Sequence, residues 1–89
     1  MKFNINKKYF FEQLKKISSI IPNSSPNPLY EQILLDCSEN QLDLYAINEI
    51  MGVKIIVDKN IEINNSGKIS VSAKLLLGIV EKINDEKIL

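Results

Sequence analysis

The chain has 89 residues, with 11 lysines, no arginine and 11 acidic residues, so its formal net charge at pH 7 is zero. This length limits the chain to one domain, and an apolar fraction of 45% is ordinary for a globular protein, which argues against disorder. A neutral chain has no overall basic field that would attract nucleic acid, so any such binding must depend on how its charges are distributed.

The first third of the chain predicts a strand, a helix and a loop. Residues 2–5 alternate polar and apolar side chains, as a short strand does. A helix is expected from Lys7 to about Ile20, because apolar residues recur there at helical spacing. Three prolines between residues 22 and 28 end this helix in a loop. The expected buried stripe is Phe10, Leu14, Ile17 and Ile21, and the expected exposed face is Lys8, Glu12, Lys15 and Ser19.

From Glu31 onward the apolar residues recur with a period of two, which predicts strands. We expect a hairpin that turns at residues 39–40, then a strand over residues 52–58 that Ile61 and Ile63 extend, and a turn at residues 64–67. A strand over residues 68–71 leads into a second helix, and residues 87–89 begin a further strand. The expected buried stripe of the second helix is Leu75, Leu76, Ile79, Val80 and Ile83.

The chain contains one motif twice. An apolar residue, a polar cap and an amphipathic helix begin at Ile5 and again, 66 residues later, at Val71. The caps, Asn6 and Ser72, can accept hydrogen bonds from the free N–H groups of the first helical turn. Fewer residues follow the second copy than the first. We therefore expect an α+β fold with two amphipathic helices packed on antiparallel sheet, whose second half is incomplete.

The residue types needed for catalysis are nearly absent. The chain has no histidine, the commonest general base, and Cys37 continues an apolar alternation with Ile33 and Leu35. Carboxylates are scattered singly and the three glycines are isolated, so we expect no catalytic residues, no metal and no cofactor. One cysteine, no apolar run near membrane-spanning length and no signal peptide favour a cytoplasmic protein.

Short motifs in a fixed order give the chain a resemblance to a known family. They are Met1-Lys2-Phe3 with its helix, Pro28-Leu29 before Ile33-Leu34-Leu35, Leu42-Asp43-Leu44 before Ala46-Ile47-Asn48, and Val71-Ser72-Ala73-Lys74-Leu75-Leu76 before Ile79-Val80. In this order and spacing, the whole chain resembles the N-terminal domain of the bacterial DNA polymerase III beta subunit, the sliding clamp.

The resemblance implies a ring of two protomers, each with three similar domains, that encircles duplex DNA. The helices of such a ring line its inner wall, and the ring tethers the polymerase to its template without catalysis. Polymerase and clamp-loader subunits bind mainly the C-terminal domain, which residues 1–89 lack. The ring closes between the N-terminal domain of one protomer and the C-terminal domain of the other. On this view, residues 1–89 are an N-terminal clamp domain that is truncated before its last strands.

The resemblance also implies DNA-facing positions. Lys74 is the best match, followed by Lys8, Lys15, Lys16 and Ser24. The chain departs from the family pattern at three places: at Ser24, where the family usually has arginine; at Ile47-Asn48, where it commonly has Thr-Asp; and at Glu81, where it has a basic residue. The alternative for the lysines is that they only keep a helix face soluble, and Glu12 and Glu81 on the same faces weaken any local attraction for phosphate.

Two classes of function stay open. The first is a replication processivity factor, of which this chain forms an N-terminal domain or fragment. The second is a stand-alone protein-interaction module whose unpaired sheet edge recruits a partner strand, or else a non-functional remnant with the clamp fold. A clamp domain binds DNA with steep salt dependence, whereas an edge-binding module is insensitive to DNA.

Overall fold

The computed structural model describes residues 2–22, 27–38, 41–59, 61–82 and 87–88. The elements, in chain order, are β1 (Lys2–Asn6), α1 (Lys7–Ser18), the 3-10 helix η1 (Pro28–Glu31), β2 (Gln32–Ser38), β3 (Gln41–Ile47), β4 (Gly52–Val57), β5 (Ile61–Asn65), β6 (Gly67–Ser72), α2 (Ala73–Lys82) and β7 (Lys87–Ile88). The structure confirms both predicted helices and the predicted strands, but it contains one strand more, β5, and α1 ends two residues before Ile20. The turn expected at residues 39–40, Ile83 and Leu89 lie outside the described residues.

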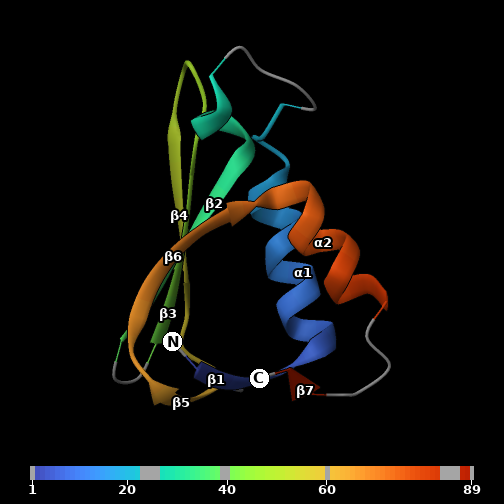
Figure 1. Ribbon diagram of the computed structural model, residues 1–89, viewed down its shortest axis with the longest axis vertical. Helices are drawn as coiled ribbons and strands as arrows, with labels where there is room; N and C mark the ends of the chain where they lie inside the picture. Colours follow the sequence, from blue (N-terminus) through green and yellow to red (C-terminus); the bar gives the residue numbers. More distant parts are fainter. Residues whose placement is uncertain (1, 23–26, 39–40, 60, 83–86, 89) are drawn as a thin grey trace.

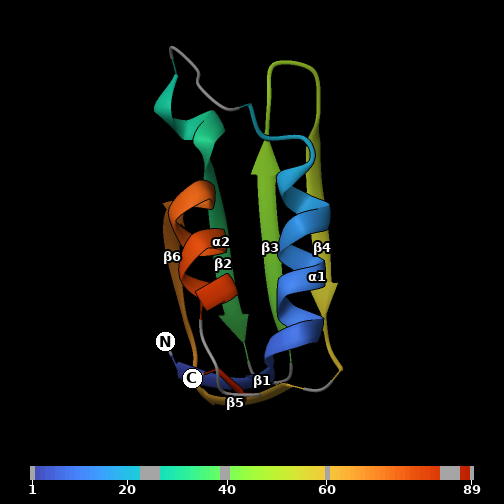
Figure 2. The same ribbon diagram turned by 90° about the vertical axis from the view of Figure 1, so that its right-hand side faces the viewer.

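The strands form two antiparallel sheets. The large sheet has the order β4-β3-β2-β6, and the small sheet has the order β5-β1-β7. Figures 1 and 2 show α1 and α2 side by side over one face of the large sheet, with α2 in front of β2 and β6 and α1 in front of β3 and β4. The small sheet closes the lower end of the space between the helices and the large sheet (Figure 1).

The prediction that Ile61 and Ile63 extend the preceding strand is wrong. These residues form β5, which pairs with β1 in the small sheet through the registers Ile5↔Ile61 and Phe3↔Ile63. Alternation of apolar residues predicts a strand but does not say which sheet the strand joins. The predicted turn at residues 64–67 is also wrong, because β5 reaches Asn65 and β6 starts at Gly67, so the chain changes sheets across Ser66.

The internal repeat is a real structural symmetry. The strand before each helix pairs with the strand after the other helix: β1 pairs with β7, and β6 pairs with β2. The registers match as well, since Ile5 lies opposite Ile88 and its counterpart Val71 lies opposite Ile33.

Both predicted helix caps are confirmed. The Oδ1 atom of Asn6 accepts a hydrogen bond from the Tyr9 amide at 3.0 Å, and the Ser72 hydroxyl accepts one from the Leu75 amide at 3.3 Å. Each cap satisfies one of the N–H groups that have no partner within the first helical turn. The two halves therefore start their helices by the same local interaction.

The core fills the space enclosed by the helices and the two sheets. Phe3 and Phe10 meet there edge to face with their ring centroids 5.9 Å apart, a favoured geometry for aromatic pairs. Burial along β2 follows the predicted alternation, and burial along β3 follows it except at Asp43, which is only 8% exposed. The buried apolar residues are Phe3, Ile5, Phe10, Leu14, Ile17, Ile33, Leu35, Cys37, Leu42, Leu44, Ala46, Val57, Ala73 and Val80.

The predicted stripe of α2 needs correction. Val80 is buried and Leu76 is half-buried, but Leu75 is 64% exposed and Ile79 is 52% exposed. Helix α2 contacts α1 and β6, and this contact covers the side of the helix that carries Ala73 and Val80. The other edge of its apolar stripe is open to solvent.

Candidate nucleic-acid interface

The charges of this neutral chain are separated between its helices and the rest of the molecule. Helices α1 and α2 contain six lysines and two glutamates, whereas the remaining residues contain five lysines and nine acidic residues. The two helices therefore carry a formal charge of +4 and the rest of the chain carries −4. Such a distribution creates a basic surface that the net charge of zero conceals.

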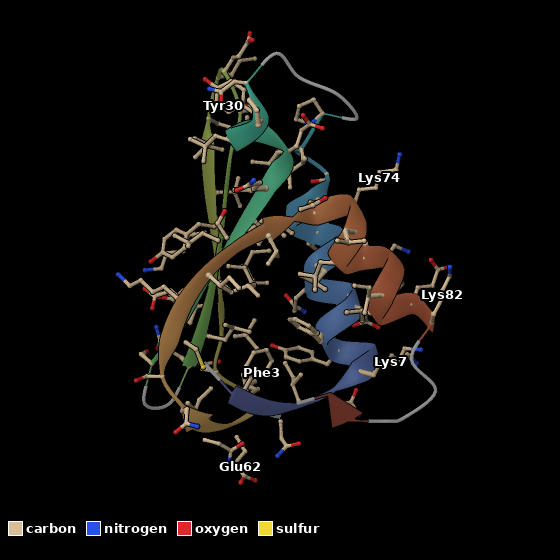
Figure 3. All side chains as sticks on the ribbon, in the orientation of Figure 1. Phe3, Lys7, Tyr30, Glu62, Lys74 and Lys82 are labelled. Atoms are coloured by element: carbon tan, nitrogen blue, oxygen red, sulfur yellow. The ribbon has the colours of Figure 1, made fainter. Side chains whose placement is uncertain are left out.

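Four of the five predicted DNA-facing residues lie on this helix pair. Lys8, Lys15, Lys16 and Lys74 are all exposed. Figure 3 shows Lys74 projecting from the helices on the side away from the large sheet. The fifth residue, Ser24, lies outside the described residues.

The helices run antiparallel, and this direction decides which lysines come together. Helix α1 rises from the small sheet, and α2 descends toward it (Figure 1). Lys15 and Lys16, in the last turn of α1, therefore lie at the same end of the helix pair as Lys74 in the first turn of α2. Lys8 lies at the opposite end.

Within the described part of the helix pair, Lys7 and Lys15 have side chains that contact neighbours in the chain. The Nζ atom of Lys7 donates a hydrogen bond to the backbone carbonyl of Glu81 at 3.1 Å, which places a cation at the negative C-terminal end of α2. The Nζ atom of Lys15 lies 5.6 Å from the centre of the Phe11 ring, within the range of a cation–π contact. Lys15 is therefore partly engaged on its own helix.

Lys82 is not among the residues that the sequence predicts to face DNA. This lysine is exposed in the last turn of α2, and it projects from the same side of the helices as Lys74 (Figure 3). Counting the charges of each predicted helix separately would have found it. Glu12 and Glu81 are exposed as well, as expected, and reduce the local positive charge.

The outer face of the large sheet presents paired charges. Asp36 and Asp43 lie directly opposite each other on β2 and β3, an arrangement that is unfavourable by itself. Lys68 lies 3.8 Å from Asp36, and Lys54 lies 3.7 Å from Asp43, so each carboxylate has a cation from the neighbouring strand. This face lacks the lysine excess of the helices.

A second surface of α2 is apolar. Leu75, Gly78 and Ile79 line a shallow groove on this helix, and Lys74 and Lys82 lie at its rim. Exposed apolar residues bordered by charged ones are typical of a protein contact surface. The basic and the apolar surfaces of α2 therefore adjoin each other.

The described residues contain no cluster of potential metal ligands, and the thiol of Cys37 is buried. None of them form a group of three or more histidine, cysteine or acidic residues that could hold a metal ion. Cys37 is buried, and this burial raises the pKa of its thiol above the ordinary value of 9.0, although the N-terminal amino group acts in the opposite direction. No helix in the described part of the chain is long and apolar enough to cross a membrane.

The fold defines the chain as a DNA clamp domain. It superposes on the beta subunit of the DNA polymerase of Streptococcus pyogenes with a TM-score of 0.94, over 99% of this chain and 24% of that one, at 19% identity. The chain belongs to the family of the DNA polymerase III beta subunit, N-terminal domain, whose model matches residues 1–89.

Curated relatives agree with this assignment. The chain is 34% identical over 87 residues to the beta sliding clamp of Mycoplasma genitalium and 28% identical over 87 residues to that of Mycoplasma pneumoniae. These alignments cover 97% of this chain but only 23% of each relative. The chain thus spans about a quarter of the length of the curated relatives it matches.

Proposed function

We propose that this chain acts as the N-terminal domain of a replication processivity factor, with its helix pair facing duplex DNA. The observation that carries the proposal is the charge separation, with six lysines and two glutamates on the helices of a neutral chain. Lysine side chains attract phosphates without reading base edges, so a surface of this kind holds DNA and still permits sliding. The proposed role is binding and needs no catalytic residue.

The proposed assembly is a ring of several such domains around the duplex. Residues 1–89 supply one domain, and polymerase and clamp-loader subunits contact other domains of the complete protein. The exposed apolar edge of α2, at Leu75 and Ile79, supports a further protein contact in the ring. The internal symmetry of the fold suggests what covers this edge in the complete protein. Further strands would continue the small sheet beyond β7 and cover α2, as β3 and β4 continue the large sheet and cover α1.

Salt-dependent binding to duplexes of unrelated sequence tests the proposal. The logarithm of the binding constant is expected to fall linearly with the logarithm of salt concentration, with a slope of about 0.9 per neutralised phosphate. Lys74→Gln is expected to weaken binding to every duplex equally and to reduce this slope by about one. Lys68→Gln is the matched control, because it removes the same charge from the outer face of the large sheet.

Each outcome of this comparison discriminates between functions. Equal losses for the two variants would mean that the helix pair is not the DNA surface. Binding that does not change with salt, or no binding at all, would favour the alternative of a protein-interaction module that recruits a partner strand at its unpaired sheet edge.

A further inference from the structure

Asn48 has an unusual set of hydrogen bonds. It follows β3 directly and begins the turn that leads to β4. Its Oδ1 atom accepts hydrogen bonds from the amides of Ile50 and Met51, both at 2.8 Å, and its own amide donates to the Met51 carbonyl at 2.8 Å. These three bonds fix the conformation of the turn. The fourth bond leaves the turn: Nδ2 donates to the backbone carbonyl of Ile20 at 3.0 Å.

The carbonyl of Ile20 lies just beyond the end of α1. Carbonyl groups at the end of a helix lack the amide partners that the helix interior provides. Here the chain leaves α1 through bonds of the short i to i−3 kind: Ser19 to Lys16 at 3.3 Å, Ile20 to Ile17 at 3.5 Å and Ile21 to Ser18 at 3.0 Å. Asn48, 28 positions further along the chain, supplies a donor to this region.

A carboxamide suits this position because the side chain must accept and donate at the same time. An aspartate could accept from the same two amides, but it has no N–H group to offer to Ile20 and would place a carboxylate oxygen against a carbonyl oxygen. Alanine would lose all three bonds that the side chain makes and would keep only the backbone bond to Met51. The three bonds of the side chain therefore need both a donor and an acceptor, which asparagine supplies in this chain and the aspartate common in the family does not.

We propose that Asn48 is a positioning residue that tethers the β3–β4 turn to the C-terminal end of α1 and thereby sets the place of Lys15 and Lys16 on the helix pair. Both lysines lie in the last turn of α1. Helix α1 packs against β3 and β4, so a fixed bond between that hairpin and the helix end limits how the last turn can shift over the sheet. The consequence for DNA rests on the function proposed above, whereas the tether itself does not.

Amide hydrogen exchange in two variants of the full chain tests the tether. Asn48→Asp retains the acceptor for Ile50 and Met51 but loses the donor to Ile20, whereas Asn48→Ala loses both. In Asn48→Asp, exchange at Ser19, Ile20 and Ile21 is expected to become roughly fivefold faster, the effect of one lost hydrogen bond, while Ile50 and Met51 stay protected. In Asn48→Ala, both groups are expected to exchange faster. Unchanged exchange at residues 19–21 in both variants would overturn the proposal, and so would a uniform increase along the whole chain, because the effect would then be general destabilisation.

DNA binding tests the positioning of the lysines. Asn48→Asp also adds a negative charge, so Ile50→Asp is the matched control: Ile50 is 88% exposed and lies in the same turn. Asn48→Asp and Asn48→Ala are expected to weaken binding to a duplex about twofold to fivefold, with Ile50→Asp close to wild type. Equal affinities for wild type and Asn48→Ala would overturn the positioning role. If wild type shows no salt-dependent binding, the proposed function fails, and the exchange experiment alone decides the tether.

Discussion

The two copies of the strand–helix motif start alike and end in different environments. In the first copy, Phe3 is 6% exposed and even the polar Gln13 is 8% exposed. Their counterparts 66 residues later, Ile69 and Ile79, are apolar and yet 46% and 52% exposed. The more hydrophobic of the two helices is therefore the less buried one.

This difference in burial follows from the strands that neighbour each helix and not from the helix sequences themselves. Helix α1 packs against β3 and β4, which extend the large sheet beyond β2. Helix α2 lies next to β6, and the small sheet ends at β7 within the described part of the chain. An amphipathic pattern sets which side of a helix is apolar, but the neighbouring strands determine how much of that side is covered.

The largest expected effect compares the equivalent core positions Phe10 and Leu76. Phe10→Ala removes a fully buried ring and is expected to cost about 3–5 kcal/mol of unfolding free energy, a large part of the stability of a domain of this size. Leu76→Ala, at a half-buried position, is expected to cost less than half as much. Urea denaturation followed by circular dichroism measures both. Equal costs would show that the second half is packed as tightly as the first.

A smaller effect concerns the two helix caps, Asn6 and Ser72. Asn6→Ala and Ser72→Ala are each expected to cost about 1 kcal/mol, because capping is a local interaction that both copies share. Thermal unfolding of the two variants under the same conditions measures the costs. A cap effect confined to the first copy would mean that the start of α2 contributes little to stability.

The smallest expected effect belongs to the exposed edge of α2. Ile79→Gln is expected to change the unfolding free energy of the chain by less than about 0.5 kcal/mol, since exposed positions tolerate such changes. Val80→Gln, at the adjacent buried position, serves as the contrast and is expected to unfold the chain. A large loss for Ile79→Gln in the isolated chain would show that this edge is already covered in solution, for example by a second copy.

Local features of this fold could be predicted from the sequence, and long-range ones could not. The strands, both helices, their caps and the repeat follow from periodicity and from hydrogen bonding between near neighbours. The pairing of β5 with β1 and the bond from Asn48 to Ile20 join residues far apart in the chain, and no local pattern specifies them. At the candidate site, Lys8, Lys15, Lys16 and Lys74 could be placed on exposed helix faces, whereas Lys82 required the charges of each helix to be counted separately.

The pairing of strands between the two halves of the chain also constrains the order in which the protein folds. Strand β1 pairs with β5 and β7, so it has no partner strand until residues 61–65 have left the ribosome, and its second partner follows at residues 87–88. Contacts between residues so distant in sequence slow folding, because a long loop must close before the contact forms. The strand that carries Phe3 and Ile5 must therefore stay free of aggregation at least while residues 7–60 are synthesised, because its edges remain unpaired for that time.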